Sequence, residues 1–133
     1  MAPRLVLHQL PGEKRAGHLA ELIENLYGNG RRVVVWVADE GRRQILDDYL
    51  WTFRKLSFVP HSLWQGGMEE TDDPVVLMGE AGNPNRADVL VVGDDLPPTN
   101  WIGSFDEIYD LIPPGPAGEA RREAWREAGL LAD

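Results

Sequence analysis

The centre of the chain reads Arg32-Val33-Val34-Val35-Trp36-Val37-Ala38, an almost unbroken run of apolar and mostly β-branched residues. β-branched residues favour strands, and a strand that is apolar at nearly every position is usually covered on both faces. Sheets covered on both faces are typical of parallel α/β proteins, because the crossover helices lie on the two faces. This run therefore predicts a central parallel strand.

Helical patterns lie on either side of this strand. Upstream, Arg4 to Gln9 reads as a first strand, and a helix from about Lys14 to Tyr27 follows it. Downstream, a second helix begins at Asp39 or Glu40. Its predicted inner stripe is Ile45, Leu46, Tyr49 and Leu50, and its predicted outer face includes Asp47 and Asp48. The alternation of strands and helices indicates right-handed βαβ crossovers.

The second half of the chain completes the predicted sheet. Pro74 to Met78 and Ala87 to Gly93 read as strands, joined by a Gly79-to-Arg86 connection that is shorter than a crossover of about a dozen residues. We therefore expect an antiparallel hairpin and a mixed sheet. The other predicted elements are an exposed loop over 64–73, a short helix near Trp101 to Phe105, a strand from Glu107 to Ile112, and a final helix from about Ala117 to Leu130 or Leu131.

The composition limits the classes of protein to consider. A chain of 133 residues fits one domain, residues 1–133, and the absence of cysteine excludes disulfides and cysteine-based metal centres. No apolar run approaches the roughly 20 residues of a membrane span, and the first residues have no signal-peptide pattern, so we expect a cytoplasmic protein. Residues 1–55 hold nine Lys and Arg against seven acids, whereas residues 56–133 hold four against 15. Such an acidic second half argues against strong direct nucleic-acid binding.

A nucleotide site would require a glycine-rich turn after the first strand. That turn reads Leu10-Pro11-Gly12-Glu13, with one glycine and an acid that would repel phosphate. The sequence therefore predicts a Rossmann-like layered α/β fold, with helices on both faces of a mostly parallel mixed sheet and no nucleotide-binding motif. We expect no cofactor.

Carboxylates at strand ends raise one enzymatic alternative. Asp39, Asp94 and Asp95 follow predicted strands, where α/β enzymes place metal ligands, so a small magnesium-dependent nuclease or phosphotransfer enzyme is conceivable. Asp is also a common cap and turn residue, and no Lys or His is spaced to act on phosphate, so we favour the cap interpretation. Because His8, His18 and His61 fall in a strand, a helix and a loop, we expect neither a metal site nor a catalytic residue.

The aromatic residues point to protein binding. Trp51 lies close in sequence to the extended segment Phe58-Val59-Pro60-His61, and proline in an extended run favours a sheet edge or a surface segment. Tryptophan is common in interface hot spots, but it is also common in cores. Trp51 is therefore either an exposed anchor or a side chain packed on its own domain.

A second candidate surface is the final helix. Arg121 and Trp125 are four residues apart, as are Arg122 and Arg126, which places guanidinium groups beside an aromatic ring. With Ile112 nearby, this arrangement suits a short acidic peptide with an apolar end. Alternatively, the arginines pair with Glu119, Glu123 and Glu127 on a solvated helix, and the charge pattern alone favours this simpler interpretation.

Two segments carry a family resemblance, namely Leu46 to Trp51 and Ser57 to Leu63, with weaker support from Arg32 to Ala38, Ala87 to Val92 with Glu107 to Pro113, and Arg121 to Gly129. They resemble the chi subunit of the bacterial DNA polymerase III clamp-loader assembly, and the resemblance covers most of the chain. It implies a Rossmann-like adaptor with no active site of its own.

The resemblance also implies two partner surfaces. Trp51, Phe58, Val59, Pro60 and His61 would bind the small psi subunit or, in exclusive complexes, an iron–sulfur helicase of DNA repair. Ile112, Arg121, Arg122, Trp125 and Arg126 would bind the acidic, Phe-terminated tail of single-stranded DNA-binding protein (SSB). The protein would then be associated with the nucleoid through these partners.

The final helix departs from the family pattern. Glu119 and Glu123 stand where the family offers basic or tyrosyl groups, and the chain nearly lacks the extension beyond Leu131. Three outcomes stay open for the SSB tail: weaker binding, binding displaced toward Arg122, or loss of binding. Whether the host has a psi subunit, and the oligomeric state, are also open.

Overall fold

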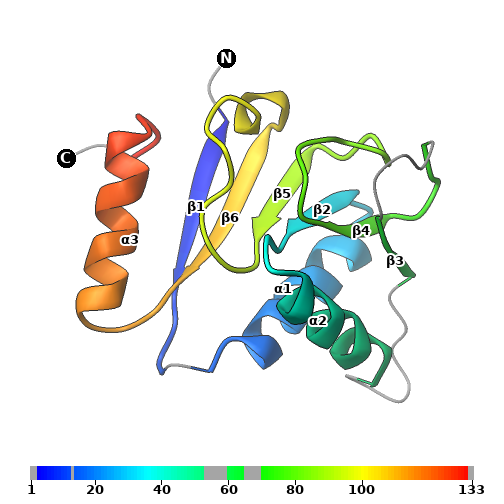
Figure 1. The fold of residues 1–133 in the computed structure, drawn as a ribbon, viewed down its shortest axis with the longest axis horizontal. Coiled ribbons are helices and arrows are strands. Elements are labelled where there is room, and N and C mark those ends of the chain that lie inside the picture. The colour runs from blue at the N-terminus through cyan, green and yellow to red at the C-terminus, as the bar shows by residue number, and fades with distance from the viewer. Residues whose placement is uncertain (1–2, 13, 53–59, 65–69, 132–133) are drawn as a thin grey trace.

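A computed structural model describes residues 3–12, 14–52, 60–64 and 70–131. Over these residues the chain forms a layered α/β domain (Figure 1). Its elements are β1 (Arg4–Gln9), α1 (Ala16–Gly28), β2 (Val33–Trp36), α2 (Glu40–Thr52), β3 (His61–Leu63), β4 (Val75–Met78), β5 (Val89–Val92), the short 3-10 helix η1 (Ile102–Ser104), β6 (Glu107–Ile112) and α3 (Pro116–Glu127). None of the helices in the described ranges is long and apolar enough to cross a membrane.

The strands form one sheet in the order β1-β6-β5-β2-β4-β3, and every neighbouring pair is parallel. All four residues of β2 are buried, as are all residues of its neighbours β4 and β5. The predicted central parallel strand and the Rossmann-like layered fold are therefore confirmed.

The predicted antiparallel hairpin is wrong. β4 and β5 do not pair with each other, because β2 lies between them and pairs with both, so the described sheet is fully parallel rather than mixed. A four-residue strand is only about 13 Å long, and an extended connection of the length between Met78 and Val89 reaches more than twice that distance. The chain can therefore return to the start of β5 without a helix.

Side-chain bonds hold this short return in place. Asn85 is fully buried, and its amide donates to the carbonyl oxygens of Val33, Asp73 and Pro74, at 3.1, 3.1 and 3.2 Å. The Trp101 indole N–H donates to the Gly82 carbonyl oxygen at 3.2 Å. The connection is therefore tied both to the beginnings of the central strands and to the segment before η1.

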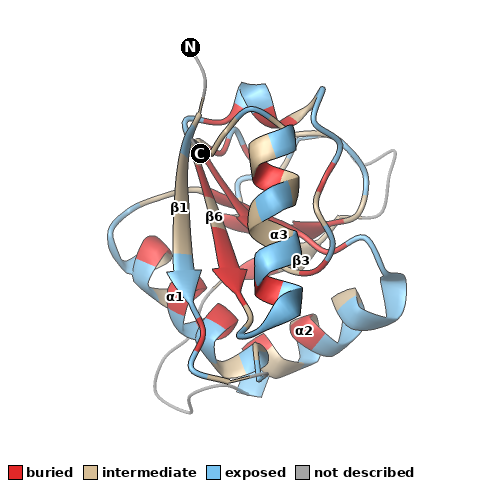
Figure 2. Cartoon of the chain, turned by 90° about the vertical axis from the view of Figure 1, so that its left-hand side faces the viewer, coloured by how far each residue is buried: buried red, intermediate tan, exposed pale blue. Residues whose placement is uncertain are grey.

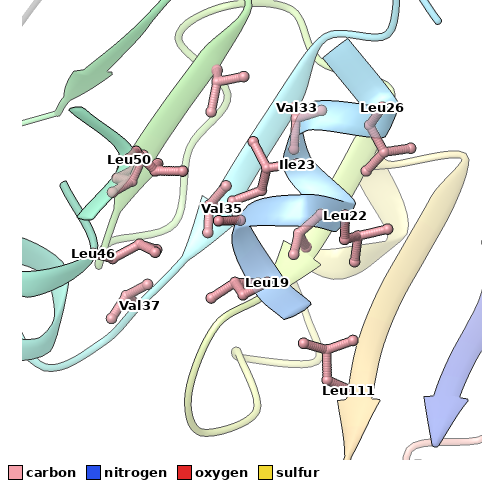
Figure 3. Packing of buried hydrophobic residues seen from close by; sticks show 14 of the residues in the cluster. Leu19, Leu22, Ile23, Leu26, Val33, Val35, Val37, Leu46, Leu50 and Leu111 are labelled. Atoms are coloured by element: carbon pink, nitrogen blue, oxygen red, sulfur yellow. The ribbon is translucent and has the colours of Figure 1, made fainter. Parts of the chain in front are cut away.

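The two faces of the sheet carry separate hydrophobic clusters. One cluster lies under α1 and α2, where Leu19, Ile23 and Leu46 pack on β2 and its neighbours (Figure 3). The other contains Trp36, Phe105 and Trp125, which bring η1 and α3 onto the opposite face. Figure 2 shows α3 beside β6, with its buried residues on one side. Helices on both faces, as predicted, leave the sheet edges and the helix surfaces as places for partners.

Candidate functional site

The first predicted surface lies where the end of α2 meets the edge strand β3. The Trp51 side chain is 52% exposed, and its ring centroid lies 4.5 Å from that of His61, at an interplanar angle of 45°. Pro60 directly precedes β3. Phe58 and Val59 lie outside the described residues. The structure thus brings Trp51 of α2 against His61 of β3, and Pro60 is the chain neighbour of His61.

Asp47 supports this arrangement from within α2. Its Oδ1 lies 3.0 Å from Nε2 of His61, whose side chain is fully buried, and the contact is an ion pair when the imidazole is protonated. The prediction that Asp47 faces solvent is therefore wrong, because the carboxylate turns toward β3. The inner stripe also needs one correction, since Ile45 is 67% exposed.

The second predicted surface, on α3, is built around a buried carboxylate. Asp110 of β6 is fully buried, and Arg121 binds it in a bidentate manner, with Nε–Oδ2 at 2.6 Å and Nη2–Oδ1 at 2.8 Å. The Trp125 indole N–H donates to Asp110 Oδ2 at 2.7 Å, and the Trp125 side chain is fully buried. These α3 residues therefore anchor the helix to the sheet.

The remaining predicted residues of this surface are divided between core and solvent. Ile112 is 1% exposed and belongs to the core. Arg122 is half-buried and donates to Gln9 Oε1 at 3.1 Å, and Arg126 pairs with Glu123 at 3.0 Å. The alternative pairing with glutamates on α3 is thus observed for Arg126. The guanidinium groups of Arg122 and Arg126 reach the surface of the helix.

Asp110 and Arg15 were not predicted as site residues. Arg15 precedes α1, and its guanidinium donates to the carbonyl oxygens of Leu111 and Val92, at 3.2 and 3.5 Å. It also lies 3.8 Å from Asp110 Oδ1. Burial lowers the pKa of Arg15, and the positive charge of Arg121 lowers it further. One feature of the sequence could have revealed Asp110: it is the single acid in the otherwise apolar end of the strand Glu107–Ile112.

The carboxylates of the enzymatic alternative have backbone roles. Asp39 Oδ2 accepts the Arg42 N–H at 2.8 Å and caps α2. Asp94 is buried, and its two oxygens accept the N–H groups of Ala38 and Asp39, at 2.9 and 3.0 Å. These bonds lie at the carboxyl ends of β2 and β5, the edge at which open α/β sheets usually bind ligands. Within the described ranges no three His, Asp or Glu side chains are arranged to hold a metal ion.

These features define a class: a small Rossmann-like α/β protein with a half-exposed tryptophan against a buried histidine at one sheet edge, and polar strand-end residues bound to its own backbone. Asp94 joins the ends of β2 and β5 through these backbone bonds. The sequence profile of the DNA polymerase III chi subunit family, HolC, matches residues 3–129. The chain belongs to this family.

Relatives agree with this assignment. The chain is 33% identical over 107 residues to the DNA polymerase III subunit chi of Pseudomonas aeruginosa, a match that covers 79% of this chain and 72% of the relative. It is 30% identical over 94 residues to a probable DNA polymerase III subunit chi of Rickettsia prowazekii, covering 71% of this chain and 54% of the relative.

A solved structure shares the architecture. The C-terminal domain of the S. cerevisiae protein Dbp5, in a complex with Gle1 and IP6, aligns with a TM-score of 0.64 at 11% identity, covering 99% of this chain and 88% of that domain. A separate structure of the C-terminal domain of the DEAD-box protein Dbp5 gives the same TM-score at 12% identity. At these identities the likeness concerns the fold alone.

Proposed function

We propose that this chi family member is a non-catalytic adaptor of DNA replication and repair. It links SSB to the clamp loader through psi, or to an iron–sulfur repair helicase, and works in the cytoplasm at the nucleoid. The observation that carries this proposal is the half-exposed Trp51 ring, packed against the tilted ring of His61 at the edge of the sheet. An exposed Trp held by a structured neighbour is well suited to be an interface anchor.

The psi or helicase surface consists of Trp51, Phe58, Val59, Pro60 and His61. Asp47 holds the buried His61, and His61 in turn supports the Trp51 ring, so less side-chain freedom is lost when a partner covers that ring. Preorganisation of this kind increases affinity without additional contacts.

The SSB tail binds on the side of α3. Arg122 and Arg126 present guanidinium groups that can clamp the carboxylates of an acidic peptide. Ile112, Arg121 and Trp125 contribute from below, because they fix α3 on the sheet. The protein carries a formal charge of -9, so this binding should weaken as salt screens the local positive groups.

The magnesium-dependent enzyme has no comparable support, because Asp39 and Asp94 accept hydrogen bonds from backbone N–H groups. Among the described residues, Asp39, Asp94 and Asp95 do not form a group that could hold a metal ion. An enzyme of that kind would be stabilised thermally by millimolar Mg²⁺, and the Asp94→Asn variant would lose the effect. For the adaptor we expect an unchanged melting temperature.

The psi and helicase surface can be tested by capture of each purified partner on the immobilised protein. Trp51→Ala should weaken capture at least about tenfold, because it removes a large anchor ring. Ile45→Ala is the matched control, since Ile45 is also exposed on α2 but belongs to the other side of the helix, facing α1. Phe58→Ala should behave like Trp51→Ala. If Trp51→Ala and Phe58→Ala both captured the partners fully, with native folding by circular dichroism, this surface assignment would be refuted.

A further inference from the structure

A small cavity opens between α1 and α2 at the carboxyl end of the sheet. Its volume is about 140 Å³, and its apolar walls include Leu19, Val37, Leu46 and Tyr49. Leu19, Val37 and Leu46 lie close together in Figure 3. Because an apolar cavity of about 150 Å³ can hold a benzene ring, this space suits one aromatic or branched aliphatic side chain.

The mouth of the cavity is positively charged. Arg15 and Arg42 line it together with the exposed Ile45. Burial and the charge of Arg121 lower the pKa of Arg15 most, Asp110 and Asp94 raise it, and the charge of Arg42 lowers it by a smaller amount. In the part of the chain that the structure describes, the Arg42 guanidinium forms no ion pair. Two nearby cations beside an apolar cavity would accept a carboxylate attached to an apolar group.

Four arginines form a row along the carboxyl edge of the sheet: Arg122, Arg121, Arg15 and Arg42. Arg122 lies at the end of β1 through its bond to Gln9, and Arg121 lies at the end of β6 through Asp110. Arg15 contacts the carbonyl oxygens at the ends of β6 and β5, and it shares the cavity with Arg42.

The carboxylates along this row are largely committed to other groups. Asp110 binds Arg121 and Trp125, Asp94 accepts two backbone N–H groups, and Asp39 caps α2 beside Arg42. The four arginines of the row stand against these three carboxylates, so the row keeps one net positive charge. That excess stands out on a protein whose formal charge is -9.

We infer that an acidic peptide runs from α3 along this row and inserts its last, apolar side chain into the cavity between α1 and α2. The terminal carboxylate would then lie between Arg15 and Arg42. This inference rests on the proposed binding of the SSB tail and adds where the tail ends. It also supplies an apolar site for that residue, which the Trp125 and Ile112 side chains do not offer, because both are buried in the core.

The experiment is a fluorescence-anisotropy titration of a labelled acidic peptide with C-terminal Phe, at low salt. Arg42→Ala and Ile45→Asp should each weaken binding about tenfold, because one removes a charge-assisted bond and the other places an acid at the mouth. Arg4→Ala is the matched control: it removes one exposed arginine at the opposite end of the sheet and should leave the affinity unchanged. Amidation of the peptide C-terminus should weaken binding to the wild type more than to Arg42→Ala.

Each result decides a different point. Wild-type affinity in both cavity variants, together with loss of binding in Arg126→Ala, would overturn the cavity and leave tail binding on α3 intact. Absence of binding to the wild-type protein would overturn the SSB part of the proposed function, and the cavity assignment with it. If Arg4→Ala weakened peptide binding as much as Arg42→Ala, the loss of affinity would reflect the overall charge of the protein, and the cavity assignment would also be overturned.

Discussion

Asp110 is the residue on which the attachment of α3 depends most directly. Asp110→Ala would leave the half-buried Arg121 guanidinium and the buried Trp125 N–H without their carboxylate partner. Loss of one partner from a buried ion pair usually costs about 3–5 kcal/mol, so we expect a decrease of that size in the free energy of unfolding. Urea denaturation followed by tryptophan fluorescence measures it.

Asp106→Ala is the matched control for this change. Asp106 is an exposed acid directly before the same strand, and its replacement should alter stability by less than about 0.5 kcal/mol. If Asp110→Ala and Asp106→Ala gave the same small effect, the Asp110 cluster would not be the main anchor of α3.

Individual residues differed in how far the sequence revealed their roles. The cap at Asp39 was predictable, because its partner lies three residues away in the same helix. The spacing of Arg121 and Trp125 correctly placed them on one side of a helix. Their partner Asp110, however, lies on a separate strand, and helical spacing alone does not say which side faces the sheet. The sequence therefore suggested a surface where the structure has an internal anchor.

The close approach of α3 to the end of β6 depends on a glycine. A Cβ added at Gly118 would collide with the carbonyl oxygen of Pro113 and would meet Ile112 Cγ2 at 3.1 Å. Both obstacles are rigid, so the helix itself must shift. We expect Gly118→Ala to destabilise the protein by about 1–3 kcal/mol despite the better helix propensity of alanine.

Amide hydrogen exchange would locate this effect. Faster exchange should be confined to α3 and the end of β6, while α1 and α2 keep native protection. Ala117→Gly, one residue earlier and exposed, is the control for a change in helix propensity alone. Unchanged protection of α3 in Gly118→Ala would contradict a tight contact.

The elements themselves were easier to predict than their pairing. Strands such as β1 and β6 were located to the residue, because apolar runs and the flanking prolines mark them clearly. The pairing of β4 with β5 was predicted wrongly, because the length of their connection was compared with that of a helical crossover. Strands of only four residues can be crossed by an extended segment, and Asn85 secures that segment through bonds to the distant Val33 carbonyl. Such long-range bonds leave no periodic pattern in the sequence.

The two proposed partner surfaces use different parts of the molecule, which gives a prediction about simultaneous binding. One surface centres on Trp51 at the end of α2 and the β3 edge. The other follows Arg122 and Arg15 near β1, β6 and β5 and ends at Arg42, near the start of α2. We expect the affinity for the tail peptide to change less than about twofold when psi is bound, since distant sites without shared groups are usually additive.

Calorimetric titration of the tail peptide into the protein, alone and with psi, measures this quantity. Trp51→Ala supplies the control, because it should weaken psi binding at least about tenfold while leaving the tail affinity of the free protein intact. A competitive decrease in tail affinity with psi would mean that the two partners share a surface, and the bridging role would fail.

The shared carboxylate of Asp110 has a consequence for how this protein can change over generations. A single side chain serves Arg121 and Trp125 of α3 and lies beside Arg15 at the start of α1, so helices on opposite faces of the sheet depend on one position. Replacing any one member leaves a buried partner unsatisfied, whereas replacing the whole group with apolar residues can be nearly neutral. Substitutions here should therefore be inherited as a set, and descendants that lose the aspartate should be found without the arginine at position 121.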